Sequence, residues 1–311
     1  MAGREGDEPV VPRSYHGRTM VETVRSARRP WDRAGILEES SPQRLYLELL
    51  KGVLTRYAFG ETKRLIEPAK GTRQRLLYLP VKKLLGALGV QLVRPVRFDR
   101  GAREIGIDWP PDAETMIGLT GLDMLEYCAT DVLRLKVPGD FIETGVWRGG
   151  AAIFMRAVLE AYGDRDRVVW AADSFRGLPK PDPSHDTDVE DALWRYPRLA
   201  ISLEEVRANF ERYGLLDDRV RFLVGWFHET LSTAPIERLA LLRLDGDLYE
   251  STMVALEALY PKLSGGGYVI VDDYHAVRGC RNAVDEFRAR HRITEEIVQT
   301  DWARVFWRRE R

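Results

Sequence analysis

Cysteine is nearly absent from this 311-residue sequence, which holds only Cys128 and Cys280. Two cysteines cannot build a disulfide framework, so a reducing compartment is expected. The sequence also lacks any run of 18 apolar residues without a charge, and its first residues carry no apolar signal core. We therefore expect a cytoplasmic protein without a transmembrane helix.

An excess of charge of either sign is also missing. Lys and Arg number 47 against 48 Asp and Glu, which leaves a formal net charge of -1. No global field favours nucleic acid or another charged polymer as a partner. Apolar residues make up 44% of the chain, enough for a sizeable core. The length predicts one large domain or one domain with an appendage.

The N-terminal third differs in character from the rest of the chain. Residues 1–40 carry seven basic and seven acidic residues with few consecutive apolar positions, which indicates a flexible arm. Residues 41–60 place leucines at helical spacing behind Ser41-Pro42, a pair typical of a helix start. We expect a helical extension over residues 41–111 that covers the main domain or mediates self-association into a dimer or larger oligomer.

A local excess of positive charge lies within this extension. Residues 62–100 hold ten Lys or Arg against two acidic residues, in a basic and amphipathic segment. Such a segment could contact a membrane surface or an anionic ligand. The reading that we favour is a helical cover or subunit contact with a solvated basic face, without membrane binding.

Short apolar strands alternate with helices from residue 112 to the C-terminus. The predicted strands cover residues 140–146, 168–173, 220–224, 240–245, 268–272, 293–299 and 303–308. The predicted helices cover residues 113–136, 150–162, 202–213, 251–263 and 279–290, the third behind a capping box and the fourth ended by glycines 265–267. This alternation predicts a seven-stranded, mostly parallel α/β sheet over residues 112–311. The last two strands lack an intervening helix, so they should form a hairpin with one antiparallel strand.

Acidic residues end the first two of these strands. Glu143 closes the first strand, within FIETGVWRGGA, and Asp173 closes the second. A carboxylate in that position can accept hydrogen bonds from two ribose hydroxyls. The glycines after Glu143 do not form the G-x-G-x-x-G turn of dinucleotide sites, and bulky residues stand between them. A nucleoside joined to an amino acid, such as S-adenosylmethionine, suits this loop better than a dinucleotide.

Two further strands each end in a pair of acidic residues. The sequence LLRLDGDLYES places Asp245 and Asp247 after one strand, and GYVIVDDYH places Asp272 and Asp273 after the next. Four carboxylates at one sheet edge repel each other unless a cation lies between them, and their oxygens suit Mg²⁺. If Asp245 and Asp272 only capped the following helices, one carboxylate per strand would remain unexplained.

Several of these segments resemble the macrocin O-methyltransferase family, whose members methylate sugar hydroxyls of macrolide, aminocoumarin and related antibiotics. The resemblance rests on FIETGVWRGG, ADSFRGLPKPD, GWFHETL, LRLDGDLYEST and GGYVIVDDY, and extends from about residue 41 to the C-terminus. It implies a class I, Rossmann-like methyltransferase fold and dependence on S-adenosylmethionine and Mg²⁺. The implied acceptor is a small molecule, either a finished glycoside or a nucleotide sugar.

The resemblance also implies roles for individual residues of the cofactor site. It assigns Thr115 and Met116 to a cover over the methionine end of the cofactor, and Glu143, Gly145, Val146 and Trp147 to the first cofactor loop. It assigns the ribose contact to Asp173 and Ser174, and the enclosure of the adenine to Gly225, Trp226 and Phe227. Asp245 is placed beside the cofactor as well as on the metal.

For the chemistry, the resemblance implies Asp245, Asp272 and Asp273 as metal ligands and Asp247 as proton acceptor. The loop over residues 179–196 carries one histidine, His185, as a second candidate for the proton acceptor. We expect a metal that lowers the pKa of a sugar hydroxyl and aligns it with the methyl group. The alternatives are a catechol- or small-phenol-type O-methyltransferase, a metabolite-binding protein without catalysis, and a nicotinamide oxidoreductase.

Overall fold

The computed structural model describes residues 41–60, 62–66, 73–96, 98–181 and 193–310. Its main body is a seven-stranded sheet with the strand order β5-β4-β3-β6-β7-β9-β8. The strands are β3 (Asp140–Thr144), β4 (Val169–Asp173), β5 (Val220–Val224), β6 (Leu239–Leu244), β7 (Leu263–Val271), β8 (Val298–Gln299) and β9 (Val305–Arg308). Only β9 runs antiparallel to its neighbours, which confirms the predicted α/β sheet.

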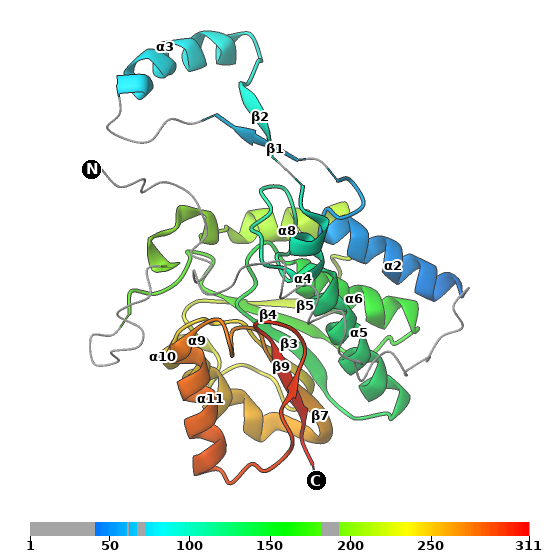
Figure 1. Cartoon of the computed structure of the whole chain (residues 1–311). Coiled ribbons are helices and arrows are strands. Elements are labelled where there is room, and N and C mark those ends of the chain that lie inside the picture. Colours follow the sequence, from blue (N-terminus) through cyan, green and yellow to red (C-terminus); the bar gives the residue numbers. More distant parts are fainter. Residues whose placement is uncertain (1–40, 61, 67–72, 97, 182–192, 311) are drawn as a thin grey trace.

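Helices cover both faces of this sheet (Figure 1). One face carries α2 (Pro42–Leu54), α5 (Gly118–Arg134), α6 (Gly150–Ala161) and α8 (Leu203–Arg212), and the other carries α10 (Tyr249–Leu259) and α11 (Arg278–Arg290). Alternate strand residues face alternate sides, so Phe141 packs into the first layer and Ile142 into the second. Short helices α4 (Arg100–Ile105) and α9 (Phe227–Thr230) and the turns η2 (Leu193–Arg195) and η3 (Pro197–Leu199) complete the body.

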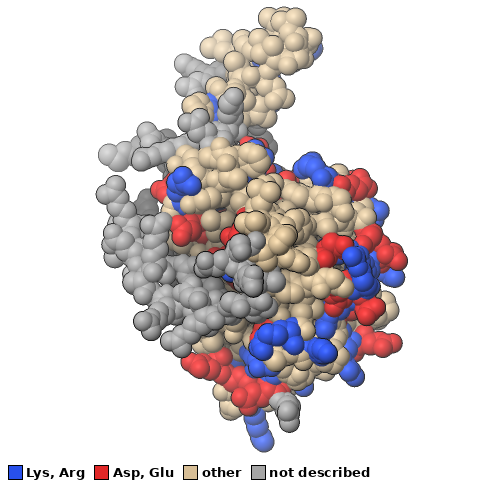
Figure 2. Space-filling model, turned by 90° about the vertical axis from the view of Figure 1, so that its right-hand side faces the viewer, with Lys and Arg blue, Asp and Glu red and all other residues tan. Residues whose placement is uncertain are grey.

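Residues 62–66 and 73–96 form an arm away from the sheet (Figure 1). Strands β1 (Thr62–Leu65) and β2 (Val93–Val96) pair antiparallel, and α3 (Arg73–Ala87) lies between them in sequence. The expectation of a wholly helical extension was therefore wrong for these two strands. The β-branched Val93 favours an extended backbone more than a helical one. Figure 2 shows the arm as a projection, and the face seen there is mostly uncharged.

Three predicted boundaries also differ from the structure. The helix expected from residue 113 begins at Gly118, because the amides of Glu114 and Thr115 both donate to the carbonyl of Leu54. Glycines 265–267 do not end a helix. Pro261 lies in the turn η4 (Tyr260–Lys262) that follows α10, and the glycines belong to β7, where a side chain at Gly267 would lie 2.8 Å from the carbonyl oxygen of Ala240. The strand expected at residues 293–299 shortens to β8.

Membrane insertion finds no support in the helices. Among the residues that the structure describes, no helix is long and apolar enough to cross a bilayer.

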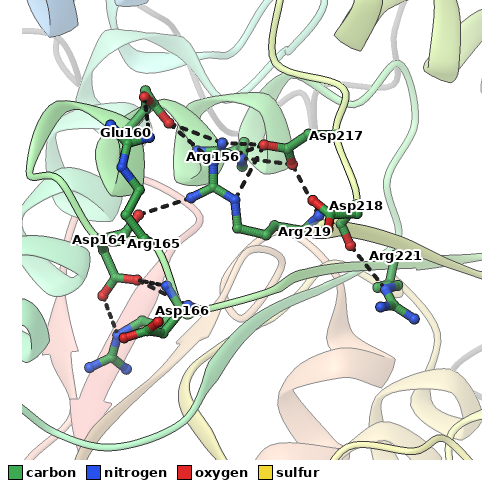
Figure 3. A network of polar contacts seen from close by, with 10 residues as sticks. Arg156, Glu160, Asp164, Arg165, Asp166, Asp217, Asp218, Arg219 and Arg221 are labelled. Carbon is green, nitrogen blue, oxygen red and sulfur yellow. Dashed lines mark hydrogen bonds and ion pairs between the residues drawn. The ribbon is translucent and has the colours of Figure 1, made fainter.

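A buried arginine fixes α6, the helix that begins beside the site described below. Arg156 has a side chain only 3% exposed and contacts Asp217 at 2.5 Å and Glu160 at 3.0 Å (Figure 3). Arg219 contacts the same two carboxylates and closes the network. These bonds, first of all the one from Arg156, lower the pKa of Asp217 to about 2. The network ties α6 to the turn that precedes β5.

Replacing Asp217 with Asn should destabilise the protein in a pH-dependent way. The folded-state pKa lies below the ordinary value of 3.8, so the carboxylate stabilises the fold above about pH 4 and loses this effect as the pH falls toward about 2. At pH 7 we expect a loss of about 1–2 kcal/mol, discounted because a third of the side chain is exposed. Urea unfolding of both proteins at several pH values measures the difference between their unfolding free energies. A difference that does not become smaller in acid would contradict this account.

Candidate active site

The carboxyl ends of β3, β4, β6 and β7 meet at one edge of the sheet and border a cavity of about 760 Å³. The parallel register places Glu143 of β3 opposite Arg243 of β6. The chain continues past each strand in the same order, since the amide of Asp245 donates to Thr144 and the amide of Asp272 to Leu244. The residues after β6 and β7 are therefore side by side, as the sequence predicted.

The loop after β3 depends on glycine at one position. Gly145 has φ +86°, and a Cβ there would lie 1.7 Å from the carbonyl oxygen of Asp245. Only glycine lets this loop cross the end of β6 so closely. Val146 and Trp147 follow and line the cavity, and Trp147 holds a left-handed φ of +45° while its indole nitrogen donates to the carbonyl of Arg198.

Asp173 at the end of β4 holds this loop in place. Its Oδ2 accepts from the amide of Val146 at 2.7 Å and its Oδ1 from the amide of Phe175 at 2.7 Å. Burial nevertheless raises the pKa of Asp173, and these bonds oppose the rise. Ser174 lines the cavity beside it and donates to the carbonyl of Gly177. Asp173 itself lines the cavity, and its predicted ribose contact stays a prediction.

The segment before α5 forms another wall. Thr115 and Met116 line the cavity, and the amide of Gly150 at the start of α6 donates to the carbonyl of Glu114. Glu114 itself also lines the cavity and is 7% exposed, yet sequence reasoning missed it. The sequence offered one signal for this residue, because Glu114 directly precedes Thr115 and Met116, which were predicted to cover the cofactor.

The residues after β5 divide into two groups. Trp226 and Phe227 line the cavity, as expected for an enclosing wall. Gly225 is not among the lining residues; its amide donates to the carbonyl of Asp173, so it joins the ends of β4 and β5. His185 lies outside the residues that the structure describes.

At the far side of the cavity, three carboxylates converge. Oxygens of Asp245, Asp272 and Asp273 lie within 4.8 Å of one another. Asp247, held at a left-handed φ of +55°, lines the same space. The four acidic residues named from the sequence are thus brought to one end of one cavity.

Two buried arginines that sequence reasoning missed lie among these acids. Arg243 donates to Glu143 at 2.6 Å and to Asp272 at 2.6 Å, and it also contacts Asp245 at 2.8 Å. Arg304, directly before β9, donates to Asp272 at 2.8 Å. The signal for Arg243 was a charged residue inside an otherwise apolar strand, LALLRL.

The two arginines do not neutralise the site. Burial, with Asp272 adding to it and Arg243 opposing it, raises the pKa of Asp245 to about 6. Burial and then the charges of Asp247, Asp245 and Asp272 hold the pKa of Asp273 well above its usual range. Only for Asp272 do Arg304 and Arg243 overcome burial and lower the pKa.

Glu143, beside the loop after β3, also has a raised pKa that its arginine partner does not offset. Burial raises its pKa to about 8 against the pull of Arg243. Its Oε2 and the Oδ2 of Asp273 are buried and have no hydrogen-bond partner among the described residues. Both residues line the cavity, where each offers an acceptor to a bound cation or donor.

The two cysteines and the aromatic residues Phe210 and Tyr196 lie in the core or on the cavity wall. Phe210, Cys128 and Cys280 are buried in the two apolar layers, and burial raises the pKa of both thiols. Tyr196 does line the cavity, where its ring stands edge-on to Trp109 at 5.8 Å.

The family model described as macrocin-O-methyltransferase (TylF) matches residues 43–309. The chain belongs to the macrocin O-methyltransferase family. It is therefore an S-adenosylmethionine-dependent O-methyltransferase, which confirms the family resemblance and the enzyme class expected from the sequence.

Two relatives whose names give the compound and the position that they methylate are similar to this chain in sequence. The 8-demethyl-8-(2,3-dimethoxy-alpha-L-rhamnosyl)-tetracenomycin-C 4'-O-methyltransferase of Streptomyces olivaceus is 58% identical over 212 residues, 68% of this chain and 81% of that one. The mycinamicin III 3''-O-methyltransferase of Micromonospora griseorubida is 54% identical over 222 residues, 70% and 87% of the two chains. The solved structure of the O-methyltransferase NovP covers 86% of this chain and all of its own at 45% identity, with a TM-score of 0.74.

Replacing Gly145 with Ala should destroy the site. The new Cβ would meet the Asp245 backbone, in addition to the roughly 1–2 kcal/mol that a left-handed alanine costs. We expect loss of S-adenosylmethionine binding in calorimetry and an unfolding free energy lower by more than about 2 kcal/mol. The matched control is Gly163→Ala, with φ +71° and no atom within 4 Å, which should show the conformational cost alone. Equal behaviour of the two variants would refute the proposed backbone crossing.

Proposed function

We propose that this enzyme methylates a sugar hydroxyl of a glycosylated natural product and that its carboxylate cluster holds Mg²⁺. The observation that carries the proposal is the convergence of Asp245, Asp272 and Asp273 at the end of a cavity whose other wall is the loop after β3. The named relatives methylate a rhamnosyl tetracenomycin and mycinamicin III, which supports a glycoside as acceptor. A nucleotide sugar remains the second acceptor class to be tested.

The residues of the first loop fit the methyl donor. S-adenosylmethionine supplies a sulfonium-bound methyl group, and for its polar groups the cavity offers the unpartnered Oε2 of Glu143 and the carboxylate of Asp173 on its wall. Trp226 and Phe227 supply an aromatic wall, and Thr115 and Met116 close the side above α6. With the cofactor bound, these walls would exclude water from it and hold it beside the carboxylate cluster.

The carboxylate cluster fits a hard divalent cation. All donor atoms are oxygens, and the unpartnered Oδ2 of Asp273 is buried. Burial and the neighbouring charges of Asp247, Asp245 and Asp272 raise the pKa of Asp273, as expected for carboxylates that lie close together without a cation between them. When bound, Mg²⁺ would supply Lewis acidity that lowers the pKa of an adjacent hydroxyl.

Asp247 is the proposed proton acceptor. Its carboxylate lines the cavity next to the cluster, and its left-handed backbone turns the chain there between Asp245 and α10. A positioned base of this kind contributes typically about 10²–10⁴-fold to the rate. The second candidate, His185, stays a prediction because it lies outside the described residues.

Methyl transfer should be observed with glycosides and depend on Mg²⁺. Labelled S-adenosylmethionine is incubated with glycosylated natural products, nucleotide sugars and a catechol, with Mg²⁺ or with a chelator. We expect label in a sugar methyl ether, and loss of turnover after chelation that added Mg²⁺ restores. Full turnover in chelator would refute the metal, and transfer to the catechol alone would favour the small-phenol alternative.

The variant Asp247→Asn separates the base from the metal ligands in the same assay. It should lower turnover by about 10²-fold or more while Mg²⁺ affinity changes little. Unchanged turnover would exclude Asp247 as the base.

We also propose that the arm joins two copies of the chain. Leu77, Val81, Leu84 and Leu88 follow helical spacing on and just beyond α3 and are 46–77% exposed, so one chain leaves this apolar stripe open. Covering it against a second copy removes apolar surface from water. The basic residues between the leucines then remain solvated at the rim.

Light scattering after size-exclusion chromatography should give at least twice 35.6 kDa. The double variant Leu77→Glu/Leu84→Glu should elute as a monomer, whereas the control Lys82→Glu, on the other side of α3, should not. A wild-type monomer, or binding of the arm to anionic lipid vesicles instead, would overturn this assembly.

A further inference from the structure

Arg304 stands beside the carboxylate cluster because of the sheet register. Strands β7 and β9 pair antiparallel, with Val271 opposite Val305. The next position of this pairing puts Arg304 opposite Asp272 at the strand end. The Arg304 side chain is 2% exposed, and such a buried guanidinium is stable only when its hydrogen bonds are satisfied.

Two anchors fix this side chain. Its Nε donates to Oδ1 of Asp272 at 2.8 Å and its Nη1 to Oδ2 of Asp301 at 2.7 Å. Asp301 is fully buried, and its Oδ1 accepts the amides of Ala303 and Arg304. Arg304 therefore cannot leave Asp272 without breaking a local turn.

Arg243 contacts the same carboxylate from the other side of β7, because β7 lies between β6 and β9. Its Nη2 donates to Oδ1 of Asp272, the oxygen that Arg304 also contacts, and reaches Asp245 as well. Its Nη1 is anchored on Glu143. Both arginine contacts use Oδ1 of Asp272, so they fix its rotamer while its Oδ2 is left for another partner.

We propose that Arg304, together with Arg243, is a positioning residue that orients Asp272 for the divalent cation. The inference rests on the proposed function, since it assumes that the cluster takes Mg²⁺. Mg²⁺ demands near-ideal geometry, and hydrogen-bonded partners that orient its ligands are typically worth about 10–100-fold in affinity. If the arginines served only to offset negative charge, a lysine would serve equally well.

The variant Arg304→Lys tests orientation at constant charge. A single ammonium cannot span Asp272 and Asp301 as the guanidinium fork does. We expect Mg²⁺ and Mn²⁺, titrated by calorimetry, to bind about 10–100-fold more weakly than to the wild type. Asp301→Asn, which keeps the shape but weakens the anchor, should shift affinity in the same direction and serves if Arg304→Lys does not fold.

Arg156→Lys is the matched control, because Arg156 is equally buried and ion-paired but belongs to the network of Figure 3. It should lower the unfolding temperature and leave metal affinity unchanged. Wild-type affinity in both Arg304→Lys and Asp301→Asn would overturn the positioning role and leave the proposed function intact. A wild-type protein that takes up neither Mg²⁺ nor Mn²⁺ would instead refute the proposed metal and this inference with it.

Discussion

Repulsion among buried carboxylates is the constraint around which this site is organised. Glu143, Asp245, Asp272 and Asp273 are drawn to one sheet edge by strand register, and the guanidinium of Arg243 bonds to three of them. Arg243 and Arg304 both donate to Oδ1 of Asp272, yet Asp273 still has an elevated pKa and a buried oxygen without a hydrogen-bond partner among the described residues. The proposed cation would relieve this excess of negative charge.

The rest of the fold keeps this edge close to the methyl-donor wall. Gly145 allows the loop after β3 to cross the backbone of Asp245, and Asp173 holds the same loop by two amide bonds. The loop after β3 and the carboxylate cluster therefore line the same cavity, on strands that are neighbours in the sheet.

The sequence predicted the sheet and the acidic residues well, because apolar strand runs and acidic strand ends are local patterns. It predicted neither Arg243 nor Arg304 in the site, since their partners lie 29–100 residues away. Glycines 265–267 suggested a helix end, but a close approach to Ala240 explains Gly267 within a strand. Gly225 joins two strand ends and does not line the cavity, a distinction that only tertiary structure supplies.

The central claim is that the surplus of buried acid at this edge creates a cation site. Crystals of the protein grown with Mn²⁺ test it most directly through anomalous diffraction. The account predicts one strong anomalous peak between the carboxylates of Asp245, Asp272 and Asp273. A map without a peak there, with the same carboxylates still held by Arg243 and Arg304, would contradict it.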